Sequence, residues 1–127
     1  MAYITAKPQG TATRKPADIV REWLEQAASE GRPDHYSGKR KHPRIDWYAP
    51  AIVRVRAGQP DERAYYGQCS NLSTKGAAVR CSEGVPEGSI VVLHINDGEE
   101  SVSAKVKHCS VGVGSYLLGL EFLLDAT

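Results

Sequence analysis

Two short polar motifs contain the side chains with the clearest capacity for chemistry. Arg40 and Arg44 form an RxxxR pattern, and Asn71, Ser73 and Gly76 form an NxSxxG pattern further along the chain. A guanidinium offers a fork of N–H donors that matches phosphate oxygens or the O6 and N7 edge of guanine. Its flat face can also stack on a base. These residue types therefore indicate binding of a planar, anionic ligand.

The NxSxxG pattern complements the arginines with short polar side chains. Asn71 and Ser73 lie two residues apart on an extended segment, so their side chains are expected to face the same side. Gly76 allows a positive φ at the turn and a close approach of the backbone to a ligand. We interpret the two motifs as a mobile basic clamp above a fixed polar surface. Two simpler interpretations stay open: a solvated basic loop for RxxxR, and ordinary turn chemistry for NxSxxG.

The basic charge of the chain is local. Sixteen Lys and Arg residues stand against fifteen Asp and Glu residues, which gives a net charge of +1. Residues 31–44 contain Gly and Pro without an apolar period, which predicts a loop. Five basic residues stand against one acidic residue there, a local net charge of +4; they are Arg32, Lys39, Arg40, Lys41 and Arg44 against Asp34. Anion binding must therefore depend on this segment.

An amphipathic helix is expected over residues 16–30, after a flexible tail at residues 1–15. Proline at position 16 suits the first helical turn, and Gly31 with Pro33 ends the helix. The apolar stripe consists of Ile19, Val20, Trp23, Leu24, Ala27 and Ala28. This stripe either packs on the domain's own core or forms a surface for a partner or a second copy. In the second case Trp23 would be the anchor.

From residue 45 onward the apolar period changes to two, which is typical of half-buried strands. Six strands are predicted at residues 51–55, 65–69, 77–81, 90–95, 102–106 and 116–122. The connections are too short for a crossover helix, so the sheet should be antiparallel. A tight Asp-Gly hairpin turn is expected within residues 96–99. The predicted fold is mainly β: a six-stranded antiparallel barrel, closed or nearly closed, preceded by an N-terminal α-helix.

Over about residues 38–123 the sequence resembles the PilZ domain family. RxxxR at Arg40 and Arg44 precedes the first strand, and the [D/N]xSxxG motif follows at the junction of the second and third strands. Residues 88–93 resemble the family's G-x-x-hydrophobic strand, and residues 119–122 resemble its closing Gly-x-x-Phe strand. The two motifs occur in full and in the family's order.

The resemblance implies a PilZ-type barrel that binds cyclic di-GMP. Arg40 and Arg44 would hold the phosphates and guanine edges. Asn71, Ser73 and Gly76 would line the surface below. Lys39 lies immediately before the motif, where family members vary and ligand stoichiometry is influenced.

The resemblance also implies a receptor or adaptor in which the ligand orders the arginine loop and repositions a flanking segment. Many family members carry a helix after the last strand, whereas here the helix precedes the barrel. The N-terminal helix at residues 16–30 is therefore the expected output element, contacting an unidentified protein partner.

Catalysis and metal binding are not expected. The sequence has no Gly-x-Ser-x-Gly elbow and no GxxxxGK[ST] phosphate loop, its histidines are scattered, and its three cysteines have no CxxC spacing. No cofactor is implied beyond the ligand.

Without a long apolar run or an apolar leader, a cytoplasmic protein with no membrane insertion is expected. The alternatives are a protein-interaction adaptor that ignores nucleotide, or a small-barrel nucleic-acid binder using Tyr65 and Tyr66.

Overall fold

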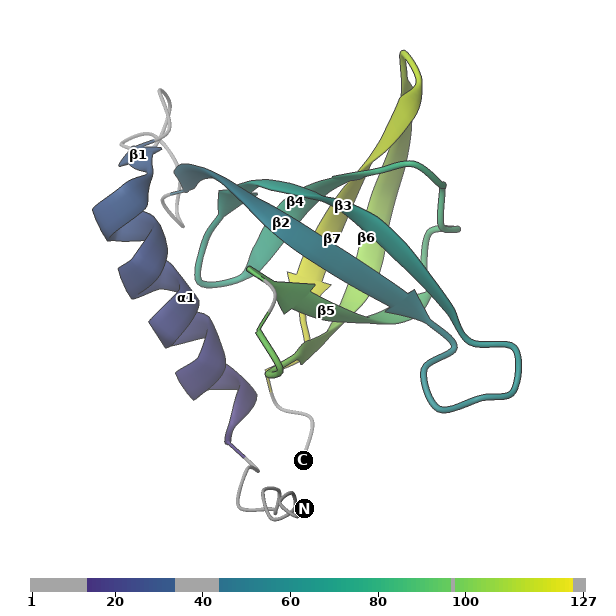
Figure 1. Ribbon diagram of the computed structural model, residues 1–127, viewed down its shortest axis with the longest axis horizontal. Coiled ribbons are helices and arrows are strands. Elements are labelled where there is room, and N and C mark those ends of the chain that lie inside the picture. Colours follow the sequence, from purple (N-terminus) through teal and green to yellow (C-terminus); the bar gives the residue numbers. More distant parts are fainter. Residues whose placement is uncertain (1–13, 34–43, 97, 125–127) are drawn as a thin grey trace, which may run out of the picture.

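The computed structural model describes residues 14–33, 44–96 and 98–124, and Figure 1 shows a β-barrel with one helix beside it. Helix α1 spans Pro16–Glu30, the range that the sequence predicts. The strands are β1 Arg32–Pro33, β2 Ile45–Val55, β3 Arg63–Leu72, β4 Gly76–Cys81, β5 Ile90–Ile95, β6 Val102–Gly112 and β7 Ser115–Phe122.

The strands form one antiparallel sheet that closes on itself. Its order is β1-β2-β3-β4-β7-β6-β5, and an additional pairing of β2 with β5 completes the barrel. Val53, for example, lies opposite both Tyr65 of β3 and Leu93 of β5. The predicted six-stranded antiparallel barrel with an N-terminal helix is therefore confirmed. Several strands are longer than their apolar runs suggest, because ladder hydrogen bonds continue past the last alternating residue.

The barrel interior is filled by inward-facing side chains from all six long strands. On β2 the buried residues alternate strictly at Trp47, Ala49, Ala51 and Val53. The largest fully buried side chains elsewhere in the barrel include Leu72, Leu93, Ile95 and Leu118. Alternation thus separates a packed interior from an outer surface that can carry a site.

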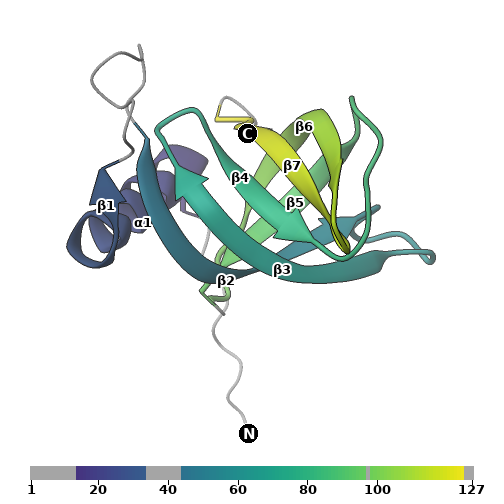
Figure 2. The same cartoon turned by 90° about the horizontal axis from the view of Figure 1, so that it is seen from above.

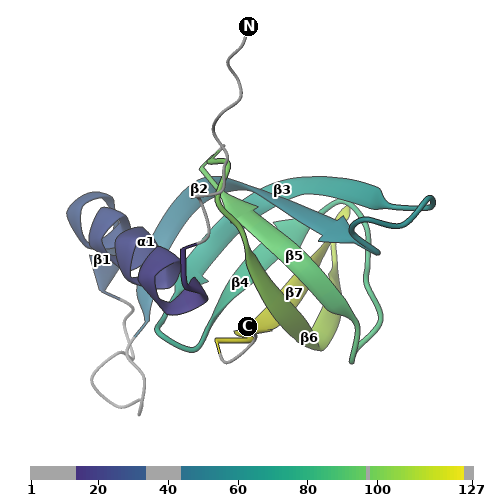
Figure 3. The same ribbon diagram turned by 90° about the horizontal axis from the view of Figure 1, so that it is seen from below.

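Helix α1 lies across one end of this interior, on one side of the barrel only (Figures 2 and 3). Ile19, Val20, Trp23 and Ala27 are buried, and the Trp23 ring lies 6.2 Å from the ring of Phe122. The apolar stripe therefore packs on the domain's own core. Of the two interpretations left open, core packing holds, and the alternative of Trp23 as an exposed partner anchor does not fit a side chain that is only 5% exposed.

Both ends of α1 are fixed to the barrel by polar contacts. At the C-terminal end, Trp47 Nε1 donates a hydrogen bond to Glu30 Oε1 at 3.0 Å. At the N-terminal end, Arg14 contacts Glu22 and Glu100, each at 2.8 Å. Arg14 belongs to the segment predicted as a flexible tail, and these ion pairs connect it to α1 and to the β5–β6 connection. Residues 1–13 lie outside the described part of the chain.

The predicted loop at residues 31–44 begins with a strand. Arg32 and Pro33 of β1 pair with Asp46 and Ile45 of β2. This pairing brings the two ends of the basic segment together, with Pro33 opposite Ile45. Residues 34–43, which include Lys39 and Arg40, lie outside the described residues.

The connection between β5 and β6 is wider than the tight Asp-Gly turn predicted for it. The last paired residues are Leu93 and Val102, and the positive φ of 64° falls on Asn96. The Gly98 N–H bonds to the Ile95 carbonyl oxygen at 3.2 Å. The Asn96 N–H donates to the Pro50 carbonyl oxygen at 2.7 Å, so the end of β5 stays bonded to β2 after its pairing with β6 has ended.

Candidate functional site

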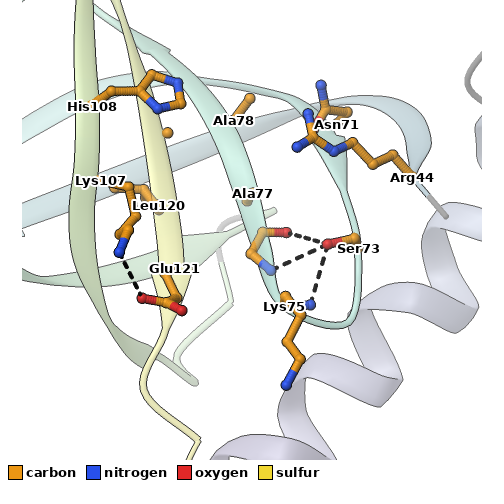
Figure 4. A pocket seen from close by; sticks show the side chains of 12 residues that line it. Arg44, Asn71, Ser73, Lys75, Ala77, Ala78, Lys107, His108, Leu120 and Glu121 are labelled. Carbon is orange, nitrogen blue, oxygen red and sulfur yellow. Dashed lines mark hydrogen bonds and ion pairs between the residues drawn. The ribbon is translucent and has the colours of Figure 1, made fainter. Parts of the chain in front are cut away.

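A pocket of about 270 Å³ opens on the outer surface of the barrel over β4, β6 and β7 (Figure 4). Its lining residues are Arg44, Asn71, Ser73, Lys75, Gly76, Ala77, Ala78, Lys107, His108, Gly119, Leu120 and Glu121. Four of the six predicted site residues are thus brought together: Arg44, Asn71, Ser73 and Gly76. The other two, Lys39 and Arg40, lie outside the described residues.

A β-bulge in β3 turns Asn71 toward the pocket. Cys69 pairs with Val79 and Asn71 pairs with Ala78, so Ser70 is an extra residue on β3. The extra residue shifts the alternation, and both Cys69 and Leu72 point into the core. Asn71 therefore faces outward, where strict alternation from Cys69 would have buried it.

Ser73 fixes the turn between β3 and β4. Its hydroxyl oxygen accepts hydrogen bonds from the N–H groups of Lys75 at 3.2 Å and Gly76 at 3.3 Å. The same hydroxyl lies 3.4 Å from the Gly76 carbonyl oxygen, to which it can donate. Ser73 is only 6% exposed. These are the local turn hydrogen bonds that the simpler interpretation of the NxSxxG motif predicts. They also set the shape of the pocket floor.

Gly76 is required by close strand packing. A Cβ at this position would collide with the carbonyl oxygen of Leu120, because β4 and β7 approach closely where Gly76 pairs with Glu121. The sequence-based expectation of a positive φ at Gly76 is wrong: among described glycines, positive φ occurs at Gly58, Gly88 and Gly114. The glycine of the motif therefore allows β7 to lie beside the turn.

A second bulge, in β6, brings two residues to the pocket that the sequence did not assign to it. Val106 pairs with Leu120 and His108 pairs with Gly119, so Lys107 is the extra residue. Lys107 and His108 are both exposed on the outer side, and Cys109 returns to the inner side. The only sequence feature that could have indicated His108 is Gly119, where a Cβ would collide with the imidazole ring.

The charges around the pocket favour an anion. Arg44, Lys75 and Lys107 contribute three cations, against the single carboxylate of Glu121. The Lys107 Nζ lies 3.6 Å from Glu121 Oε1, and both side chains are about half exposed. Arg44 comes directly before β2, so its side chain reaches the pocket from the side opposite Lys107 (Figure 4). The pocket thus offers cations on two sides of a neutral floor.

The three cysteines do not belong to this pocket. All are free thiols, and burial raises the pKa of Cys69 to about 12 and of Cys81 to about 11.

The described residues contain no group of His, Cys, Asp and Glu side chains arranged to hold a metal ion. Nor does that part of the chain contain a helix with the length and apolar character to cross a membrane.

Comparison with known proteins gives a matching family and related solved structures. The family model described as PilZ domain matches residues 38–127. Among solved structures, the chain is similar to the "PilZ domain with c-di-GMP of YcgR from Escherichia coli", with 18% sequence identity and a TM-score of 0.50. The alignment covers 69% of this chain and 80% of that chain. A search of the curated proteins found no match.

Proposed function

The chain belongs to the PilZ domain family, and from this premise we propose that it is a receptor for cyclic di-GMP. One observation carries the proposal: Arg44 and the NxSxxG residues, far apart in sequence, line one pocket with an excess of positive charge. The related structure is that of the YcgR PilZ domain with c-di-GMP, which supports the same ligand class. We assign residues 38–123 to the receptor domain.

In this proposal some pocket residues contact the ligand and others shape the surface on which it lies. Arg40 and Arg44 hold phosphates and guanine edges through charge-assisted, two-pronged hydrogen bonds. Asn71 offers an amide to the ligand, while Ser73 and Gly76 act mainly by shaping the floor on which the ligand lies. Lys39 influences how many ligand molecules bind.

His108 adds a flat surface to the site. Its ring rests over Gly119, which leaves the imidazole exposed on the outer face of β6. A planar ring held in this way can stack on a base. We therefore include His108 with Lys107 among the ligand-contacting residues.

The connection between pocket and helix supports a signalling role. Arg44 comes directly before the β1–β2 pairing, and β1 directly follows Gly31, the C-cap of α1. A Cβ on Gly31 would collide with the Asp46 carbonyl oxygen, so the helix end and β2 are tightly packed. Ligand contacts to Arg40 and Arg44 would order the arginine loop and reposition α1 against an unidentified protein partner. The protein is then a cytoplasmic binding module, with no catalytic residue assigned.

Calorimetric titration with cyclic di-GMP tests the proposal, with GTP and a short single-stranded DNA as controls. Saturable binding of cyclic di-GMP alone is expected, and the fitted stoichiometry decides between one ligand and a stacked pair. Binding of DNA with a steep salt dependence would favour the nucleic-acid alternative. Absence of any binding would favour an adaptor that does not respond to nucleotide.

A further inference from the structure

One edge of the barrel is left open at the hairpin of β6 and β7. On the side of β6 away from β7, strand pairing with β5 ends at Lys105, and the bonds of Val106 to Gly88 and Ser89 follow. Beyond this point no described residue pairs with residues 107–112 on that side. Figure 1 shows this hairpin projecting beyond the rest of the barrel. We call residues 107–112 the open edge.

The hairpin geometry shows which backbone groups of the open edge lack a partner. Gly112 and Ser115 flank the two-residue turn and form its closing pair. In such a turn the closing residues bond to each other, and the direction of backbone groups alternates along the strand. The N–H and C=O groups of Cys109 and Val111 therefore point away from β7. They are free to form a ladder with another strand.

The side chains of this hairpin lack the features that usually protect an edge. Residues 109–116 contain no charged side chain. Val111 is 80% exposed and Val113 is fully exposed, although both are apolar. Two protective features, a β-bulge and a charged side chain, are present only at Lys107, the end of the open edge nearest the barrel. Long, uncharged edges with exposed apolar residues favour pairing with another strand.

We propose that the open edge pairs antiparallel with the same edge of a second copy of this chain, forming a symmetric dimer. If Ser110 lies on the two-fold axis, Cys109 of each copy faces Val111 of the other. Each of these two pairs then exchanges two main-chain hydrogen bonds, about four in all. The exposed Val111 side chain becomes covered by its cross-strand neighbours.

The same register keeps like charges apart, which favours a second copy as the occupant. Lys107 of one copy lies next to the turn of the other, so the two lysines are separated by about 20 Å along the strands. The seryl hydroxyls at the axis can hydrogen-bond to each other. The resulting sheet is continuous across both barrels in the order β7-β6-β6-β7. This dimer goes beyond the receptor proposal and requires no nucleotide.

Sedimentation equilibrium of the full chain, without nucleotide and with a reductant to exclude disulfides, tests the dimer. A reversible monomer–dimer equilibrium is expected. V111P removes an N–H that points to the open edge but no bond to β7, so it should lower the association constant at least about tenfold. V111T keeps the N–H and the β-branched shape and is the matched control. It should retain association within a few-fold of the wild-type value.

Three results would overturn the proposal: a wild-type chain that stays monomeric at every concentration, V111P association equal to wild type, or V111T association lost as fully as in V111P. The last result would indicate a side-chain contact in place of strand pairing. Amide hydrogen exchange of the wild-type chain is independent of any variant's folding. Protection of the Cys109 and Val111 amides should rise with protein concentration, and concentration-independent exchange at both would contradict edge pairing.

Discussion

Arg44 is the residue whose role in the pocket can be tested most directly. It comes directly before β2, and its side chain lines the same pocket as the NxSxxG turn. Asn71 and Arg44 line the pocket and are the residues we propose to contact the ligand. Ser73 and Gly76 are engaged in the turn and in strand packing, so we expect them to shape the site.

Arg44→Ala should weaken cyclic di-GMP binding by about 1.5–3 kcal/mol, because a charge-assisted hydrogen-bond donor is lost. Calorimetric titration measures the change. Arg21→Ala is the matched control, since Arg21 is an exposed α1 residue that pairs with Asp18. Equal affinity for Arg44→Ala and wild type would show that the clamp is assigned to the wrong residue.

Gly76→Ala should destabilise the fold by about 1–3 kcal/mol, because the new Cβ meets the Leu120 carbonyl oxygen and forces β4 and β7 apart. Chemical denaturation monitored by circular dichroism measures the loss. Lys75→Ala in the same turn has an exposed side chain and should change stability by less than about 0.5 kcal/mol. A fully stable Gly76→Ala protein would refute the packing explanation of the motif glycine.

At the scale of elements, α1 is both part of the core and the proposed output segment. Its inner face fills one end of the barrel, and Trp47 with Glu30 fixes its C-terminal end. Removing the helix would therefore uncover Phe122 and its neighbours. Point variants and spectroscopic reporters test the helix more cleanly than truncation does.

Trp23→Ala should lower the free energy of unfolding by about 3–5 kcal/mol, since it leaves a large cavity against Phe122. Glu25→Ala on the exposed face of the same helix is the control, with a change within about 0.5 kcal/mol. The two values come from denaturant titrations. If both substitutions had the same small effect, α1 would not be docked on the core in solution.

Ligand-driven movement of α1 can be followed with Trp23 as the single tryptophan. In a Trp47→Phe variant, the remaining indole lies between α1 and the end of the barrel and is 5% exposed. Saturating cyclic di-GMP should change its emission and increase quenching by acrylamide, because the helix is repositioned. Bound ligand with unchanged emission and quenching would mean that α1 does not transmit the signal.

At the scale of the whole molecule, Arg14 lies between Glu22 of α1 and Glu100 of the β5–β6 connection and forms an ion pair with each. Hydrogen bonding to Arg14 lowers the pKa of Glu22 below its ordinary value of 4.5. A carboxyl with a lowered folded-state pKa stabilises the fold above its unfolded pKa. This contribution is lost as the pH falls through the folded-state pKa.

Melting temperature should therefore drop on acidification below pH 4.5, and Glu22→Gln should reduce that drop. Because these side chains are exposed, the effect should be small and should weaken further with salt. Glu25→Gln is the control, since Glu25 forms no ion pair with any described residue. Identical pH profiles for wild type and Glu22→Gln would contradict the prediction.

The sequence by itself determined the helix at Pro16–Glu30, the six long strands and the antiparallel barrel, because these depend on local periodicity and short connections. It also identified four residues that line the pocket, since RxxxR and NxSxxG are contiguous patterns. The roles of these residues in binding, and the exact bounds of the domain, stay predictions.

Only the tertiary structure decided which side chains meet. Whether Trp23 is buried or exposed depends on the barrel end against which it packs, which lies almost a hundred residues away at Phe122. The bulges at Ser70 and Lys107 reverse the strict alternation of inward and outward side chains that a sequence pattern implies. His108 reaches the pocket only because of the bulge at Lys107. The pairing of β4 with β7 likewise joins Gly76 to Leu120 and Glu121. Bulges and strand partners are fixed by long-range packing and hydrogen bonding, so local patterns do not contain them.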